Sequence, residues 1–259
     1  SLRRRQRQMC IRDRKLADIG VAMGIRGTDV AKEAAQLVLL DDNFVTIVEA
    51  VREGRVIYEN LKKPINYLLS CNFGEVASIF GAELLGLPPI LRPIHLLWVN
   101  VTTDALPAIA LGLEPPEPGV MERPPRSKTD RFITNRKLAY YTFMGTLIAL
   151  MVIAMFSLSL DKGLMYAQTI AFTSLVFSEF GRALASRSET LSVSRLPRNK
   201  WLWPALLASI TLQLIVLYTP VSIIFKVKPL PLESYMLIFL VPLVLFIADE
   251  IRKTLKIRI

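Results

Sequence analysis

The sequence predicts a mainly α-helical membrane protein, with about six transmembrane helices preceded by a short α/β segment. Hydrophobic residues make up 52% of the 259 residues, and the mean hydropathy is +0.40. The apolar residues gather in long runs, each near the roughly 20 residues that a helix needs to cross a bilayer. A net charge of +10 is compatible with nucleic-acid binding. The Lys and Arg residues lie mostly between the apolar runs, however, which favours loops facing the cytoplasm and no nucleic-acid partner.

The first 44 residues differ in character from the rest. Residues 1–14, SLRRRQRQMCIRDR, are basic and aperiodic. We interpret them as a non-native tail, because RQMCIRDR resembles a translated sequencing-adapter artefact; a disordered basic tail is the alternative. Residues 15–44 are predicted to be α/β. ADIGVAM and QLVLL are typical of short buried strands, and TDVAKEAA of a helix capped by Thr28 or Asp29.

A long helix is predicted to begin after Asp42 or Asn43 and to run from the cytoplasm into the membrane, with a kink at Pro64. Its first part, residues 45–64, is amphipathic and is interpreted as a cytoplasmic stalk. The remaining residues, 65–259, are predicted to form the transmembrane domain. Its basic connections place both termini in the cytoplasm. The predicted spans are residues 65–86, 91–112, 137–160, 164–184, 202–225 and 232–252.

Polar residues at helical spacing lie inside three of these spans, where spacings of three and four place them on one face of a helix. An acid near the middle of a bilayer is costly unless something pairs with it. Oxygen ligands are what a hard cation such as Ca²⁺ requires. Helix–helix hydrogen bonding would explain the amides and hydroxyls but not the acids, so we favour an ion site. Its candidate residues are Asn72, Glu75, Asn100, Thr103, Asp104 and Glu179.

Three further residues bear on this site. Pro107 lacks a backbone donor and should break the regular helix about one turn earlier, freeing carbonyl groups as ligands. Arg182 follows Glu179 by about one turn, so it could pair with that acid and modulate its charge, or extend to the cytoplasmic interface. Glu83 lies two turns beyond Glu75. It could line an exit path for the ion, or it could have a structural role near the interface.

Three sequence stretches resemble P-type cation-transporting ATPases, and are most similar to calcium pumps of the reticulum type and their bacterial relatives. They are ADIGVAMGIRGTDVAKEAAQLVLLDDNF, NYLLSCNFGEV and LLWVNVTTDALPAIALGLEPPEPGVMERPPR. The resemblance runs from about Leu16 to the C-terminus. It implies that the first stretch ends the phosphorylation (P) domain, and that residues 65–259 are the last six helices of the pump. It also implies that the six candidate residues above occupy calcium-ligand positions.

The resemblance further implies ATP-driven export of Ca²⁺ from the cytoplasm with proton counter-transport, in the cell membrane of a prokaryote. Asn100 matches calcium pumps, whereas sodium–potassium pumps typically carry Asp there. Arg182 departs from reticulum pumps, which have a small amide at that place, and this makes one Ca²⁺ per cycle plausible. The alternatives are a P-type pump for Na⁺, K⁺ or H⁺, and a secondary transporter or channel without ATP chemistry.

The Asp-Lys-Thr-Gly motif that the family phosphorylates does not occur in this sequence. We therefore expect a C-terminal fragment that contains no catalytic residue and does not hydrolyse ATP alone. By the resemblance, ATP and Mg²⁺ would be bound in the full-length protein rather than by this fragment. The expected partners are the lipid bilayer and the missing N-terminal part of the same pump.

Overall fold

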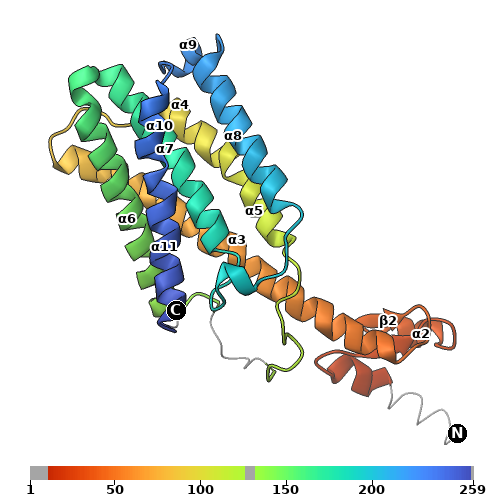
Figure 1. Cartoon of the computed structure of the whole chain (residues 1–259). Coiled ribbons are helices and arrows are strands. Elements are labelled where there is room, and N and C mark those ends of the chain that lie inside the picture. Colours follow the sequence, from red (N-terminus) through yellow and green to blue (C-terminus); the bar gives the residue numbers. More distant parts are fainter. Residues whose placement is uncertain (1–10, 126–131, 258–259) are drawn as a thin grey trace, which may run out of the picture. The chain divides into compact units, whose positions relative to one another are not determined.

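The computed structural model describes residues 11–125 and 132–257, and most of them are helical (Figure 1). The contacts within the chain divide it between Arg55 and Val56 into two compact units. This division falls inside the predicted stalk, residues 45–64. Most of the predicted non-native tail, residues 1–10, lies outside the described residues.

The first unit contains a small parallel sheet. Strands β1 (Val21–Met23) and β2 (Leu37–Leu39) pair with Val21 opposite Leu37. Helix α2 (Asp29–Glu33) connects them, and the hydroxyl of Thr28 accepts the Ala31 N–H at 3.3 Å. Thr28 is thus the cap of α2, one of the two predicted candidates, because its side chain satisfies a donor that the first helical turn leaves free.

A turn stabilised by Asp42 joins this sheet to the next helix. Asp42 has a positive φ of 51°, and its carboxylate accepts the N–H groups of Ile25 at 2.9 Å and Arg26 at 2.8 Å. The Ile25 hydrogen bond, more than the others, holds the pKa of Asp42 below its usual range, because it favours the charged form. Asn43 then accepts the Val45 N–H at 3.0 Å, where helix α3 (Val45–Leu84) begins. Helix α3 continues through Pro64 as one element.

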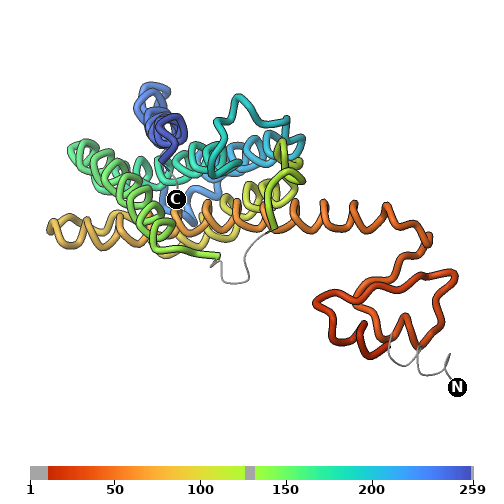
Figure 2. Tube along the Cα trace, turned by 90° about the horizontal axis from the view of Figure 1, so that it is seen from below, coloured from red at the N-terminus to blue at the C-terminus, as the bar shows by residue number. Residues whose placement is uncertain are grey.

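The second unit is helical. Helix α7 is its central element, because every residue from Ala167 to Ala183 is buried. It packs most extensively against α6 and α11, and it also contacts α5, α8 and α10 (Figure 2). The elements that follow α3 are α4 (Pro93–Trp98), the π-helical turn η1 (Val99–Thr103), α5 (Ala105–Gly112), α6 (Asn135–Ser159), η2 (Leu160–Lys162), α7 (Leu164–Ala185), η3 (Val193–Arg195), α8 (Leu202–Tyr218), α9 (Ser222–Phe225), α10 (Leu232–Ile238) and α11 (Leu240–Thr254).

Three stretches of the described residues are long and apolar enough to cross a membrane. They are Pro93–Gly112, Asn135–Lys162 and Leu232–Thr254, and they coincide with three of the six predicted spans. The predicted span 202–225 differs from the structure, because α8 ends at Tyr218 and the chain turns at Thr219 and Pro220 before α9. The predicted span 65–86 is helical in α3 up to Leu84, and the predicted span 164–184 lies within α7.

Glycines allow helices of the second unit to approach closely. A Cβ atom added to Gly74 of α3 would lie 2.8 Å from Ile148 Cγ2 of α6. One added to Gly181 of α7 would lie 2.3 Å from the carbonyl oxygen of Pro242 of α11. Small residues are the usual means of close helix packing in membranes, because they bring the backbones within van der Waals contact.

We expect Gly74→Ala to destabilise the protein by about 1–3 kcal/mol, because the new methyl group overpacks the contact with Ile148. Gly54→Ala is the matched control: nothing lies within 4 Å of a Cβ atom there, so the change should be neutral or stabilise α3 by up to about 1 kcal/mol. Thermal unfolding of the detergent-solubilised protein measures both variants. Equal midpoints for the two variants would contradict the close packing.

Candidate ion site

The helix that contains Asp104 is irregular just before this residue. In the π-helical turn η1, the Asp104 N–H reaches back five residues to the Val99 carbonyl oxygen at 2.9 Å. Pro107 has no N–H to donate to the carbonyl of Thr103, four residues earlier. That carbonyl accepts a hydrogen bond from Ser209 Oγ of α8 at 3.3 Å instead. The helix is therefore irregular one turn before Pro107, but the carbonyl of Thr103 is occupied by Ser209, and its use as a ligand stays a prediction.

Glu75 and Asn100 are brought together from α3 and η1. Asn100 Nδ2 donates to Glu75 Oε2 at 2.7 Å and to the Leu96 carbonyl oxygen at 3.0 Å. Glu75 is buried, and its second oxygen, Oε1, accepts no hydrogen bond from any residue that the structure describes. One oxygen of this acid is consequently free to bind a cation.

Asp104 lies at the end of η1 and is completely buried. Its Oδ1 accepts a hydrogen bond from the hydroxyl of Tyr67 at 2.6 Å, whereas its Oδ2 has no such partner among the described residues. Tyr67 is not among the residues predicted from the sequence. Tyr67 precedes Glu75 by eight residues, about two helical turns, so the spacing alone places both on one face of α3.

Glu179 of α7 is the third buried acid. Helix α7 contacts η1, which places Glu179 near Thr103 and Asp104. Neither carboxylate oxygen of Glu179 accepts a hydrogen bond from any described residue. Buried carboxylates are normally paired, and unpaired carboxylate oxygens are suitable ligands for a hard cation. Thr103 itself donates to the Val99 carbonyl oxygen at 3.2 Å.

Among the described residues, no hydrogen bond joins Asn72 or Glu83 to these acids, whereas Asn100 is bonded to Glu75. Asn72 is exposed on α3, and Asn100 is exposed as well. Glu83 is exposed one residue before α3 ends at Leu84. Across residues 11–125 and 132–257, no three His, Cys, Asp or Glu side chains form a group that could hold a metal ion. The acids of the candidate site thus do not form a closed metal centre.

Arg182 follows neither of its two predicted alternatives. Its side chain is completely buried, so it does not extend to the interface. It forms no ion pair with Glu179 or with any other described acid; its guanidinium instead donates to Ser70 Oγ of α3 at 3.0 Å and to the Tyr140 hydroxyl of α6 at 2.9 Å. The interpretation that Arg182 neutralises Glu179 by direct pairing is therefore wrong.

Glu114 is a buried acid that was not predicted from the sequence and that links several elements. It follows α5, and its Oε1 accepts from Arg187 Nη2 at 2.6 Å and Nε at 2.9 Å. Its Oε2 accepts from Asn199 Nδ2 at 2.5 Å, and its backbone carbonyl accepts from Asn60 Nδ2 at 2.6 Å. Glu114 thus fixes the segment after α5 to α3 and to the connection between α7 and α8.

Residues 88–255 match the family model described as "Cation transporting ATPase, C-terminus". The chain belongs to the family of cation-transporting ATPases. The chain is 50% identical to a calcium-transporting ATPase of Bacillus subtilis over 80% of its length. It is 41% identical to calcium-transporting ATPase 1 of Bacillus cereus over 93% of its length, and 40% identical to a calcium-transporting ATPase of Plasmodium falciparum over 92%.

The chain is much shorter than these relatives. It spans 24% of the Bacillus subtilis protein, 30% of the Bacillus cereus protein and 23% of the Plasmodium protein. The residues that match the family model, 88–255, include the three apolar stretches that are long enough to cross a membrane.

Proposed function

We propose that this chain is the ion-binding transmembrane portion of an ATP-driven pump that exports Ca²⁺ from the cytoplasm. The observation that carries the proposal is the convergence of Glu75, Asp104 and Glu179, each with at least one buried oxygen that lacks a hydrogen-bond donor among the described residues. The names of the similar proteins, all calcium-transporting ATPases, support Ca²⁺ as the substrate.

In this proposal the six predicted spans are the last six transmembrane helices of the pump, and residues 15–44 end its P domain. The parallel strands β1 and β2 fit a remnant of an α/β domain. Both termini face the cytoplasm, and the membrane is the cell membrane of a prokaryote. The basic connections between the apolar helices support this orientation.

The proposed ligands of Ca²⁺ are the three acids together with Asn72, Asn100 and Thr103. Asn72 and Asn100 are exposed in this chain, and they would complete the site with groups from the rest of the pump. The chain spans 23–30% of these relatives, so most of each full-length relative lies outside the matched segment. ATP and Mg²⁺ are bound by the rest of the pump. Glu83 remains a candidate for the exit path.

Phosphorylation of the pump drives alternating access of the ion site in this proposal. Helix α3 is continuous over 40 residues and carries Glu75 in its C-terminal half. A continuous helix transmits a tilt along its length, so it links movement at its soluble end to the ion site. The buried positive charge of Arg182 favours one Ca²⁺ per cycle, because a fixed cation three residues from Glu179 on α7 opposes the binding of a second cation nearby.

Proton counter-transport follows from the same burial, because bare carboxylates are costly in the interior once the ion has left. We expect sealed vesicles that contain the full-length pump to take up Ca²⁺ when ATP and Mg²⁺ are added, and their lumenal pH to rise as protons leave. A Ca²⁺ indicator and a pH dye inside the vesicles measure the two fluxes. Ca²⁺ uptake at constant lumenal pH would contradict proton counter-transport, and uptake without ATP would contradict the pump.

A pump for Na⁺, K⁺ or H⁺ is the second candidate, and the completely buried Arg182 is the observation that favours it. A fixed cation can take the place of a transported one, because both neutralise buried acids. ATP hydrolysis that is indifferent to Ca²⁺ but stimulated by Na⁺, by K⁺ or by a change of pH would favour this candidate.

A further inference from the structure

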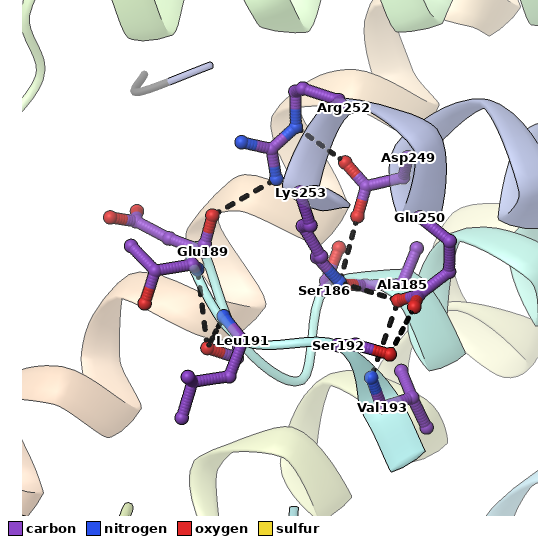
Figure 3. Close-up of polar contacts among 12 residues, drawn as sticks. Ala185, Ser186, Glu189, Leu191, Ser192, Val193, Asp249, Glu250, Arg252 and Lys253 are labelled. Atoms are coloured by element: carbon purple, nitrogen blue, oxygen red, sulfur yellow. Dashed lines mark hydrogen bonds and ion pairs between the residues drawn. The ribbon is translucent and has the colours of Figure 1, made fainter. Parts of the chain in front are cut away.

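The last turns of α11 contain a cluster of charged residues that is mostly buried. Asp249 lies at its centre, with Oδ1 accepting from Arg252 Nε at 2.8 Å and Oδ2 paired with Lys253 Nζ at 2.9 Å (Figure 3). The side chain of Lys253 is 0% exposed and that of Asp249 is 1% exposed. Buried charges of this kind are stable only when they are paired, because removal of one leaves the others uncompensated.

This cluster fixes the end of the helix that carries Glu179. Lys253 Nζ donates to the carbonyl oxygen of Ala185, the last residue of α7, at 2.7 Å. Arg252 Nη2 donates to the carbonyl oxygen of Glu189 at 3.0 Å, in the connection that follows α7 (Figure 3). The C-terminal turn of α11 therefore sets the position of the C-terminal end of α7.

A single hydroxyl connects Asp249 to Arg182. The Tyr140 hydroxyl of α6 donates to Asp249 Oδ1 and accepts from Arg182 Nη1 at 2.9 Å. The other hydrogen-bond partners of the Arg182 guanidinium are neutral oxygens, namely those of Ser70, Asn66 and Ser186. The Tyr140 hydroxyl therefore bridges the buried Arg182 guanidinium to the carboxylate of Asp249. Because the hydroxyl donates to Asp249, its lone pairs are directed toward Arg182.

We propose that Asp249 is a positioning residue of the ion site, acting through Tyr140 on Arg182. With the Tyr140 hydroxyl held as an acceptor, the guanidinium stays among Ser70, Asn66 and Ser186 and away from the unpaired oxygens of Glu179, which lies three residues earlier on the same helix. Without that acceptor, Arg182 can turn toward Glu179, because residues three apart on a helix are neighbours. The guanidinium then competes with the transported cation for the carboxylate. This inference rests on the proposed Ca²⁺ site.

The test uses the full-length pump and measures Ca²⁺ binding at equilibrium with radioactive Ca²⁺. We expect Tyr140→Phe to weaken binding about three- to tenfold, because it removes the bridging hydroxyl and keeps the ion pairs of Asp249. Asp249→Asn should shift the affinity in the same direction. Glu250→Gln is the matched control. Glu250 lies on the same turns of α11, contacts Ser192 and Val193, and shares Lys253 with Asp249 at 3.2 Å. It forms no hydrogen bond with Tyr140 or Arg182 among the described residues, so the Glu250→Gln variant disturbs the cluster without touching the bridging hydroxyl and should bind Ca²⁺ as the wild type does.

Arg182→Gln decides whether the effect passes through the guanidinium. In an Arg182→Gln background, Tyr140→Phe should no longer change the Ca²⁺ affinity, whereas a general loss of packing would still change it. Unshifted affinity in Tyr140→Phe, an equal shift in Glu250→Gln, or an undiminished effect in the Arg182→Gln background would each overturn the inference. A wild-type pump that binds no Ca²⁺ would overturn the proposed function and this inference with it, whereas wild-type binding with unshifted variants would overturn the inference alone.

Discussion

Asp104→Asn is expected to abolish Ca²⁺-stimulated ATP hydrolysis by the full-length pump at micromolar Ca²⁺, and to weaken Ca²⁺ binding on the order of 100-fold. Asn is nearly isosteric, and its carbonyl oxygen can still accept the hydrogen bond that the Tyr67 hydroxyl makes to Oδ1. The substitution removes the negative charge and replaces the unpaired Oδ2 by an amide donor. A divalent cation thus loses an anionic ligand in an interior where water cannot replace it. Coupled-enzyme assays across a Ca²⁺ titration measure the effect.

Glu233→Gln is the matched control for this change of acid to amide. Glu233 lies in the first turn of α10 and is exposed, so its substitution should leave the Ca²⁺ dependence of the pump unchanged. Asp104→Asn with wild-type Ca²⁺ stimulation would remove Asp104 from the ion site and contradict the convergence of acids on which the proposed function rests.

Glu114→Ala is expected to destabilise the protein by about 3–5 kcal/mol, because it breaks a buried ion pair by removal of one partner. Arg187 would lose the carboxylate that it contacts at 2.6 Å and 2.9 Å, and it would remain a buried and uncompensated charge. Asn199 would lose an acceptor at 2.5 Å. The backbone contact of Asn60 does not involve the side chain of Glu114 and should persist. Thermal unfolding of the detergent-solubilised protein measures the loss.

An exposed ion pair provides the comparison. Glu49 and Arg52 lie 3.4 Å apart on α3, with their side chains 57% and 46% exposed. Glu49→Ala should therefore change stability by less than about 1 kcal/mol, because water and salt already screen this pair. If the two variants unfolded at the same temperature, the buried pair of Glu114 and Arg187 would not stabilise the fold.

The irregular helix before Asp104 could be predicted from the sequence, because a proline always removes one backbone donor. Pro107 alone identifies the affected carbonyl as that of Thr103. Spacing within each helix assigns Glu75 and Asn100 to one site, although the hydrogen bond between them joins two helices and is not predicted by spacing. The cap at Thr28 follows from a local hydrogen bond that needs no distant residue.

Contacts between distant elements could not be predicted in this way. The spacing of Arg182 and Glu179 shows only that the two can meet, and the hydroxyl groups of Ser70 and Tyr140 on other helices decide that they do not. The pairing of Glu114 with Arg187 joins residues 73 positions apart, and nothing in either local sequence indicates it. The exposure of Asn72 depends on how α3 packs, which a helical period alone does not fix.

The close contact between Gly181 and Pro242 limits how the transmembrane helices can move. Helices usually slide past each other through changes of side-chain rotamer at their interface, but here the backbone of α7 faces the backbone of α11 and no side chain lies between them to adjust. Displacement of one helix toward the other by about an ångström would bring the Pro242 carbonyl into collision with α7. The part of α7 that carries Glu179, a proposed ligand, is therefore packed tightly against the last helix.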